Sequence, residues 1–151
     1  VVEKLGELSS ICYSKILREV AKAVIYKENF FLFQLRDNDD SISYPNKWSL
    51  FGGEVDKDEN FEEALKRELL EELHWCPNKF FYLAKDTDKT TNCNINYYLV
   101  PCELPDHKLI LGEGQAMKWF TINQIMDLNS ICRPYILRKI IKQADSLIKI
   151  Q

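Results

Sequence analysis

The chain has 151 residues and a formal net charge of −3, from 20 Lys and Arg against 23 Asp and Glu. Because one domain usually takes about 100–200 residues, we expect a single domain over residues 1–151 and no second catalytic domain. Hydrophobic residues make up 46% and charged residues 28%, which excludes a disordered chain, and the near-neutral charge gives no electrostatic reason to expect DNA or an acidic membrane as the main partner.

The first predicted elements are two strands that form a hairpin. Residues 20–26 are rich in β-branched side chains, and residues 30–35 form a second apolar run after a short polar break. A polar loop over residues 36–48 follows and leads to the pair Gly52 and Gly53. These signals predict an antiparallel β-hairpin near the start of the chain.

The remaining elements alternate between helices and strands. A helix is predicted from Asn60 to about Trp75, with Asp58 or Asn60 as its cap and Pro77 beyond its end. Further strands are predicted over residues 79–84, 94–102 and 117–120, further helices over residues 122–128 and 134–148, and residues 1 to about 17 are compatible with a short helix. Strands mixed with helices indicate an α/β or α+β sandwich built on a mixed sheet.

The helix that begins at Asn60 carries acidic residues where its apolar face should lie. At about 100° per residue, its apolar stripe contains Phe61, Ala64, Leu65, Leu69 and Leu73. Glu72 falls near the centre of that stripe, Glu68 at its margin and Glu71 one step further round. A carboxylate held against a core without a partner costs several kcal/mol, so a cation must compensate. Oxygen ligands of this kind favour Mg²⁺. The alternative is a surface helix with i,i+4 pairs such as Arg67–Glu71.

The spacing of these residues resembles the Nudix box, G-x5-E-x7-R-E-U-x-E-E-x-G-U, where U is apolar. Gly53, Glu59 and residues 67–75 (RELLEELHW) match every charged position of that pattern. Two departures are His74, where the family has glycine, and Phe51, where several branches have proline ahead of the paired glycines. The chain is therefore identified as a member of the Nudix hydrolase family, whose fold is an α/β/α sandwich.

Outside the box the resemblance extends to two further segments. Residues 30–36 look like the family's second strand, which often ends in a basic residue near the substrate phosphates. Residues 111–115 (LGEGQ), followed by Trp119, are similar to the E-G-Q loop of the MutT-like branch. In that branch the glutamate, here Glu113, reaches the metal site from across the fold.

The resemblance implies a hydrolase in which water attacks a phosphorus of a diphosphate bridge, with Mg²⁺ as cofactor and Mn²⁺ as a possible substitute. Carboxylates hold the metal, which neutralises phosphate oxygens and polarises the water. Carried over by position, the metal ligands and catalytic groups are Gly53, Glu68, Glu71, Glu72 and Glu113. The general base is left open between Glu68 and Glu113. Arg67 joins the catalytic set through an orienting ion pair with Glu59.

Several residues are candidates for substrate contacts. Arg36 is expected to bind phosphate through its planar donor fork, and Lys47 is a second phosphate candidate. Trp48, Tyr44 and Phe51 are candidates for stacking on a base, with loop or core packing as the alternative for each. Specificity is expected to lie in the loops over residues 37–48 and 86–91.

The E-G-Q loop favours a nucleoside triphosphate as substrate, giving the monophosphate and pyrophosphate. Nucleoside diphosphate sugars, ADP-ribose and dinucleoside polyphosphates are alternatives, and so is a catalytically silent nucleotide-binding module. An RNA-end pyrophosphatase would rest only on the five basic residues and one acidic residue over 133–149, which we interpret instead as a packed helix with a solvated basic face. The expected partner is therefore a small nucleotide and not nucleic acid.

The expected location of the protein follows from the lack of a long apolar run and from the scattered cysteines. No apolar run approaches the roughly 18–20 residues that span a bilayer, and Lys4, Arg18 and Lys22 interrupt the first 25 residues, so no membrane association is expected. The five cysteines are scattered without a C-x-x-C pair: Cys12, Cys76, Cys93, Cys102 and Cys132. This indicates a reducing, cytoplasmic location. A homodimer is left open.

Overall fold

Strands and helices alternate along the chain in the computed structural model, which describes residues 17–151. The strands are β1 (Arg18–Lys27), β2 (Phe30–Leu35), β3 (Trp48–Ser49), β4 (Phe51–Glu54), β5 (Phe81–Asp88), β6 (Cys93–Pro101) and β7 (Ala116–Thr121). The helices are α2 (Phe61–Leu73), α3 (Ile122–Asp127), α4 (Pro134–Ile150) and the 3₁₀ turn η1 (Asp106–Lys108). The short helix considered for residues 1 to about 17 lies outside the described residues, apart from Leu17 itself.

The strands form one mixed sheet in the order β3-β2-β1-β6-β5, with β4 paired to β1 and β7 paired to β2. β1 runs parallel to β6 along nearly its whole length and antiparallel to its other neighbours. On the β4 side, Lys22 lies opposite Gly52 and Ala21 lies opposite Gly53. The central strand therefore holds the glycine pair in register beside it.

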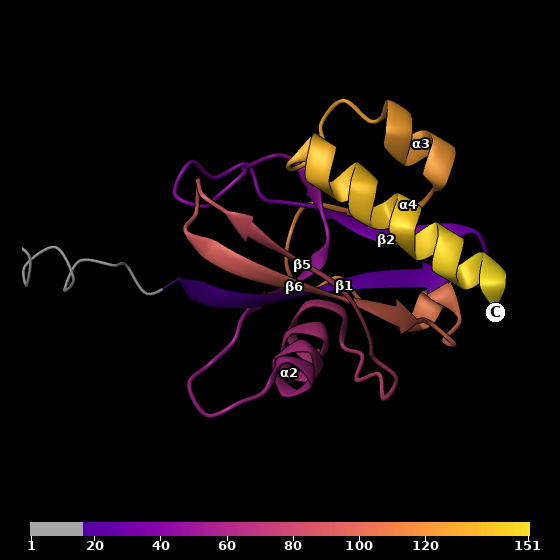
Figure 1. Cartoon of the computed structure of the whole chain (residues 1–151), viewed down its shortest axis with the longest axis horizontal. Coiled ribbons are helices and arrows are strands. Elements are labelled where there is room, and N and C mark those ends of the chain that lie inside the picture. Colours follow the sequence, from indigo (N-terminus) through magenta and orange to yellow (C-terminus); the bar gives the residue numbers. More distant parts are fainter. Residues whose placement is uncertain (1–16) are drawn as a thin grey trace, which may run out of the picture.

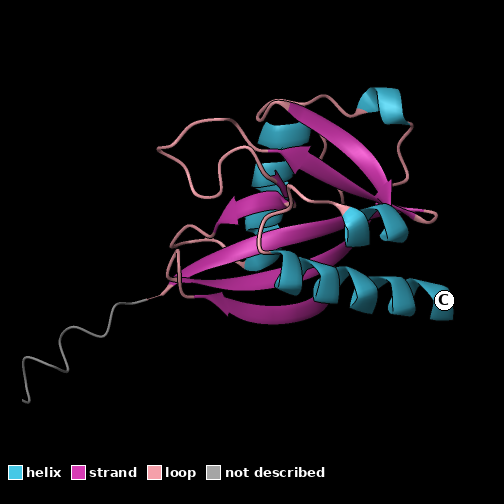
Figure 2. Cartoon of the chain, turned by 90° about the horizontal axis from the view of Figure 1, so that it is seen from above, coloured by secondary structure: helices cyan, strands magenta, loops and turns pink. Residues whose placement is uncertain are grey.

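Helices cover both faces of the sheet, with α2 on one side and α3 and α4 on the other (Figures 1 and 2). Because side chains alternate along a strand, β1 contributes to two separate cores. Ala21, Ala23 and Ile25 pack toward α2, and Val24 packs toward α4. Lys22 falls on the α4 side of this alternation. The mixed-sheet sandwich predicted from the sequence is confirmed.

Helix α2 begins and ends as the sequence indicates. Asn60 is its N-cap and forms a capping box, in which the Asn60 side chain accepts from the Glu63 backbone N–H and the Glu63 carboxylate accepts from the Asn60 N–H, both at 2.9 Å. The helix ends at His74, which adopts the left-handed conformation with φ 52° in place of the usual glycine. The contacts at both ends therefore fix how α2 is rotated about its axis, and so which way its acidic residues point.

Several strands differ from the predictions, and the two-residue strand β3 was not predicted. Strand β4 was not predicted, because two adjacent glycines lower the strand propensity of a segment. The predicted hairpin is present but pairs β1 with β2 at only two positions, since β2 pairs mainly with β7. Strand β5 extends to Asp88, into the predicted polar turn. Over residues 17–151, no helix has the length and apolar character needed to cross a membrane.

Candidate active site

The acidic residues of α2 meet the glycine pair of β4 at one hollow on the surface, which we call the acidic cavity. It has a volume of about 240 Å³, and its lining includes Gly52, Gly53, Glu68, Glu72 and Glu113 together with Gln34 and Arg36. Gly53 is required here because a Cβ atom at this position would lie 2.5 Å from Glu68 Oε1. The absence of a side chain lets the Glu68 carboxylate approach the strand.

Glu72 is the buried acid of this cavity, with 3% of its surface exposed. Its Oε1 accepts from the Gly52 backbone N–H at 3.2 Å, and its Oε2 accepts from Gln34 Nε2 at 3.1 Å. Within residues 17–151, no Lys or Arg forms an ion pair with it. Burial raises the pKa of Glu72 to about 8; nearby Lys22 opposes this rise, and Glu68 adds to it. This carboxylate therefore has neutral donors but no counter-ion in contact.

Arg67 holds Glu68 in place at the cavity wall. Its Nη1 donates to Glu68 Oε1 at 2.8 Å, and its Nη2 and Nε donate to the two Glu59 oxygens at 2.5 and 3.2 Å. Nη2 also reaches the Glu54 carbonyl at 3.0 Å. The Glu59–Arg67 ion pair predicted from the sequence is present, and it orients the acid that faces the cavity.

Glu113 reaches the cavity from a loop that docks on the C-terminal end of α2. The Ile110 N–H donates to the Leu73 carbonyl at 3.1 Å, and the Gly112 N–H donates to the Glu72 carbonyl at 2.7 Å. His74 Nδ1 lies 3.1 Å from the Ile110 carbonyl and adds a side-chain bond. These contacts satisfy helix-end carbonyls and bring Glu113 next to residues that lie about 40 positions earlier.

The donor set of the acidic cavity suits a hard divalent cation. Glu68, Glu72 and Glu113 supply carboxylate oxygens, the ligand type that Mg²⁺ prefers, and the buried Glu72 has no cation in contact. No three His, Cys, Asp or Glu side chains of the described part converge into a ready-made metal cluster. A divalent ion would therefore have to draw the three carboxylates together from their present contacts.

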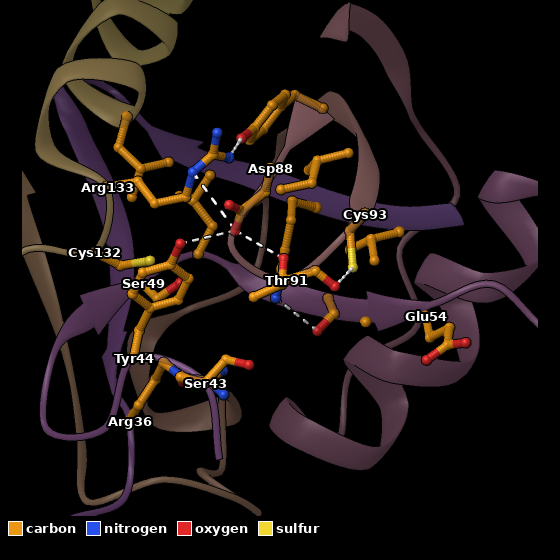
Figure 3. A pocket seen from close by; sticks show the side chains of 18 of the residues that line it. Arg36, Ser43, Tyr44, Ser49, Glu54, Asp88, Thr91, Cys93, Cys132 and Arg133 are labelled. Atoms are coloured by element: carbon orange, nitrogen blue, oxygen red, sulfur yellow. Dashed lines mark hydrogen bonds and ion pairs between the residues drawn. The ribbon is translucent and has the colours of Figure 1, made fainter. Parts of the chain in front are cut away.

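A second hollow lies on the α4 face of the sheet, and we call it the sheet-face cavity (Figure 3). It has a volume of about 250 Å³ and an apolar lining that includes Val20, Leu50 and Ile95. Arg36, Gly52 and Gly53 line both cavities. The two hollows therefore meet at the glycine pair, and one elongated ligand could occupy both.

A network around Asp88 builds the far wall of the sheet-face cavity. The Asp88 carboxylate accepts from the Tyr44 and Thr91 hydroxyls, each at 2.8 Å, and faces Arg133 Nε at 3.8 Å (Figure 3). Arg133 also pairs with Asp86. Burial works against ionisation of Asp88, but these hydrogen bonds and Arg133 outweigh it, so the pKa of Asp88 is lowered. The network ties a loop, a turn and a helix end around one carboxylate.

The structure places only part of the predicted substrate set at these cavities. Arg36 and Tyr44 line the sheet-face cavity. Phe51 is fully buried in the core against α2, so the prediction that it stacks on a base is wrong. The Trp48 ring packs edge-on against Phe120 at 5.0 Å and lines a different hollow, and Lys47 also lies outside both cavities. The structure does not support a substrate contact for either residue.

Among the predicted metal ligands, Glu71 is the one that the structure does not bring to the acidic cavity. Its side chain is 61% exposed, and its carboxylate lies 4.0 Å from Arg67 Nη1. It occupies the helix position next to Glu72 but faces solvent. To join Glu68 and Glu72, its side chain would have to rotate, so its role as a metal ligand stays a prediction from the motif.

The sequence did not point to Lys22, Gln34 or Arg133. Lys22 and Arg133 line the sheet-face cavity, and Gln34 binds Glu72 from β2. Lys22 could have been noticed from the sequence, because it is a charged residue inside the apolar run of residues 20–26. The positions of Gln34 and Arg133 depend on which strands are neighbours, which no local pattern states.

The basic face of α4 is mostly engaged within the molecule. Arg133 pairs with Asp86 and Asp88 at its start, Arg138 donates to the carbonyls of Ile125 and Leu128, and Lys149 pairs with Asp145. Leu137, Ile140, Ile141 and Ala144 are buried in the core. This agrees with the interpretation of a helix packed on the sheet.

Comparisons with known proteins agree with this geometry. A family model described as the NUDIX domain matches residues 17–140. Among solved structures, the chain is similar to a MutT protein from Methanosarcina mazei Go1, with a TM-score of 0.73 and 21% identity over 90% of this chain and 98% of that one. It is similar to a C. elegans Ap4A hydrolase, with a TM-score of 0.71 and 18% identity over 87% and 99% of the two chains.

A third similar structure is a MutT NUDIX hydrolase from Burkholderia pseudomallei, with a TM-score of 0.65 and 21% identity over 83% of this chain and 96% of that one. Among curated proteins, the comparison finds no significant match. At these identities the structural likenesses show a shared fold.

Proposed function

The chain belongs to the NUDIX family, and from this premise we propose that it is a Mg²⁺-dependent pyrophosphohydrolase that converts a nucleoside triphosphate to the monophosphate and pyrophosphate. As a member of this family it is a hydrolase that acts on pyrophosphate bonds of small nucleotides, and the family generally uses divalent metals. Beyond the family membership, we propose that the metal is Mg²⁺ and that the substrate is a nucleoside triphosphate. One observation carries it: a buried Glu72 without a counter-ion in contact lines one cavity with Glu68 and Glu113.

The residues of the acidic cavity would have three roles: binding the metal, positioning its ligands and accepting a proton. Glu68, Glu72 and Glu113, with the Gly53 carbonyl, would hold the divalent ion, which neutralises phosphate oxygens and polarises the attacking water. Gln34 and the Gly52 N–H fix the Glu72 carboxylate through hydrogen bonds. Arg67 fixes Glu68. Glu68 or Glu113 would accept the proton of the water, because both line the cavity where it would bind.

Arg36 supports a phosphate contact at the border of the two cavities. Its Nε donates to the Ser43 carbonyl at 2.8 Å, which holds the side chain in place while the rest of the guanidinium has no carboxylate partner in the described part of the chain. A planar donor fork suits phosphate oxygens. The nucleoside would then lie in the sheet-face cavity, over its apolar lining.

A substrate panel tests the proposal. Nucleoside triphosphates, nucleoside diphosphate sugars, ADP-ribose and dinucleoside polyphosphates are incubated with the protein and Mg²⁺, and the products are identified. Glu72→Gln should lower turnover by about 10²-fold or more, because it removes a metal-binding charge. Glu62→Gln, an exposed substitution in the first turn of the same helix, is the matched control and should leave turnover unchanged. Full turnover by Glu72→Gln on every hydrolysed substrate would show that the mechanism is wrong.

We also place the protein in the cytoplasm. The support is that all four cysteines in the described part of the chain, Cys76, Cys93, Cys102 and Cys132, are free thiols.

A further inference from the structure

Lys22 is a charged residue at the centre of the sheet, and neither the motif nor the family model gives it a role. It stands between Ala21 and Ala23, whose side chains are fully buried toward α2. Its own side chain points to the other face and lines the sheet-face cavity. A lysine on a central strand is rarely placed there for packing alone.

The Lys22 ammonium group has no acidic partner in the described part of the chain. Its Nζ donates to the Gly52 carbonyl at 3.1 Å. Within residues 17–151 no carboxylate forms an ion pair with it, whereas Arg18 pairs with Glu54 at 3.4 Å and Arg133 pairs with Asp86. A lysine has three N–H donors, so two remain for a ligand.

The charges that face Lys22 come from several elements. Burial lowers the pKa of Lys22; Glu72 and Glu68 on α2 oppose this, and Arg36 at the end of β2 adds to it. Two cations, Lys22 and Arg36, therefore line one cavity, and no carboxylate among residues 17–151 contacts either of them. A bound anion would relieve both the repulsion and the desolvation of Lys22.

We propose that Lys22 forms a phosphate subsite on the sheet-face side of Gly52, where it binds the phosphoryl group that stays attached to the nucleoside. This rests on the proposed function, which places the divalent ion in the acidic cavity and the nucleoside in the sheet-face cavity. Gly52 is where the two cavities meet, so a phosphate chain that joins them must pass it. The phosphoryl group next to Lys22 would lie in the same cavity as Val20 and Ile95, whose side chains line the space proposed for the nucleoside.

A purely positioning role must be separated from phosphate binding. Gly52 accepts from Lys22 through its carbonyl and donates to Glu72 through its N–H, so loss of Lys22 could act through the strand. Lys22→Gln keeps an N–H donor for the Gly52 carbonyl but removes the charge. Lys22→Arg keeps the charge. Lys139→Gln removes one charge from an exposed site on α4 and is the matched control.

The test is a calorimetric titration without divalent metal, in EDTA. The probes are the four common ribonucleoside monophosphates and the corresponding nucleosides, and the folding of each variant is checked by thermal denaturation. Lys22→Gln should weaken binding of the monophosphate by about tenfold or more, because a charge-assisted hydrogen bond is lost. It should leave nucleoside binding unchanged. Lys22→Arg should retain most of the affinity, and Lys139→Gln all of it.

Three results would overturn the subsite. They are equal monophosphate binding by wild type and Lys22→Gln, an equal loss for monophosphate and nucleoside, and no monophosphate binding by wild type at millimolar concentration. The titration needs no turnover, so it is separate from the test of hydrolysis. A protein that binds monophosphate through Lys22 but hydrolyses no substrate would contradict the proposed function and leave the subsite standing.

Discussion

Gly52 and Gly53 are adjacent, but the structure requires glycine at each for a different reason. Gly52 has φ 123°, and a Cβ there would lie 2.2 Å from the Ala21 carbonyl oxygen, which belongs to the central strand. Gly53 does not have a positive φ, and the three atoms nearest to a Cβ at this position would all belong to the Glu68 carboxylate, at 2.5 to 2.9 Å. A backbone atom of a central strand cannot move away easily, whereas the end of a glutamate side chain can.

The two alanine substitutions should therefore act on different properties, one on stability and the other on turnover. Gly52→Ala should destabilise the fold by about 3 kcal/mol, or several degrees in melting temperature, because strain and a backbone clash combine. Gly53→Ala should change stability by less than about 1 kcal/mol but lower turnover by roughly tenfold or more, because Glu68 is displaced. Thermal denaturation and a hydrolysis assay measure both. A Gly53→Ala protein as unstable as Gly52→Ala, or one with full activity, would contradict this reading of the glycines.

At the residue scale, the part of the site that lies within one helix was predictable. Glu68 and Glu72 are four positions apart, so the period of the helix alone places them together. Gln34 was not predictable as a site residue, because its position depends on the strand order. Lys22 stood out only as a charge inside an apolar run, and its place beside Gly52 depends on the register of β1 against β4. The substrate role of Phe51 was mispredicted because alternation along β4, a strand that had not been recognised, turns it into the core.

Asp88 links three elements that the sequence presents as unrelated. It ends β5, and it binds Tyr44 from the loop before β3 and faces Arg133 at the start of α4. Its side chain is only 5% exposed. The loops expected to set specificity are thus held in one shape by a carboxylate at the end of a strand.

Asp88→Asn should destabilise the protein in a pH-dependent way. The folded pKa of Asp88 lies below its usual value of 3.8, so the ionised group stabilises the fold above that pH, and the stabilisation is lost as the pH falls through the folded pKa. At pH 7 we expect a loss of about 3 kcal/mol, since one partner of a buried network is removed. As the pH falls below 3.8, the difference from wild type should shrink. Urea unfolding at several pH values measures it.

Asp58→Asn is the control for that experiment, because Asp58 is exposed in the loop before α2. It should change stability little at any pH. A difference between Asp88→Asn and wild type that stays constant from pH 7 to pH 3 would show that the lost hydrogen bonds, and not the charge, account for the effect.

At the scale of elements, most of the fold followed from local patterns. Asn60 as a candidate cap and Pro77 beyond the end predicted α2 within two residues of its ends, and the apolar runs predicted β2 and β6 within a residue of theirs. Strand order did not follow, because the parallel pairing of β1 with β6 joins segments more than 70 residues apart. The docking of the Glu113 loop on α2 is non-local in the same way.

The charge of the whole molecule is unevenly distributed. Residues 52–75 contain nine acidic and three basic residues, although the chain as a whole carries only −3. Arg67 forms ion pairs with Glu59 and Glu68, whereas Glu72 accepts hydrogen bonds from neutral donors. Lys22 and Arg36 face the neighbouring cavity. An excess of negative charge therefore lies beside two cations that have no acidic partner in the described residues, an arrangement suited to a metal on one side and a phosphate on the other.

This distribution predicts that Mg²⁺ stabilises the protein in the absence of substrate. An ion that binds only the folded state at about 100 times its Kd adds about 2.7 kcal/mol, which corresponds to a rise of several degrees in melting temperature. The comparison is between EDTA and millimolar MgCl₂ by thermal denaturation. NaCl at matched ionic strength is the control, because screening alone also weakens repulsion between the acids. Glu72→Gln should be more stable than wild type in EDTA and should respond less to Mg²⁺, since glutamine avoids the cost of burying an ionisable carboxyl group and removes a negative ligand of the ion. An equal response to NaCl and MgCl₂ would contradict specific binding at the acidic cavity.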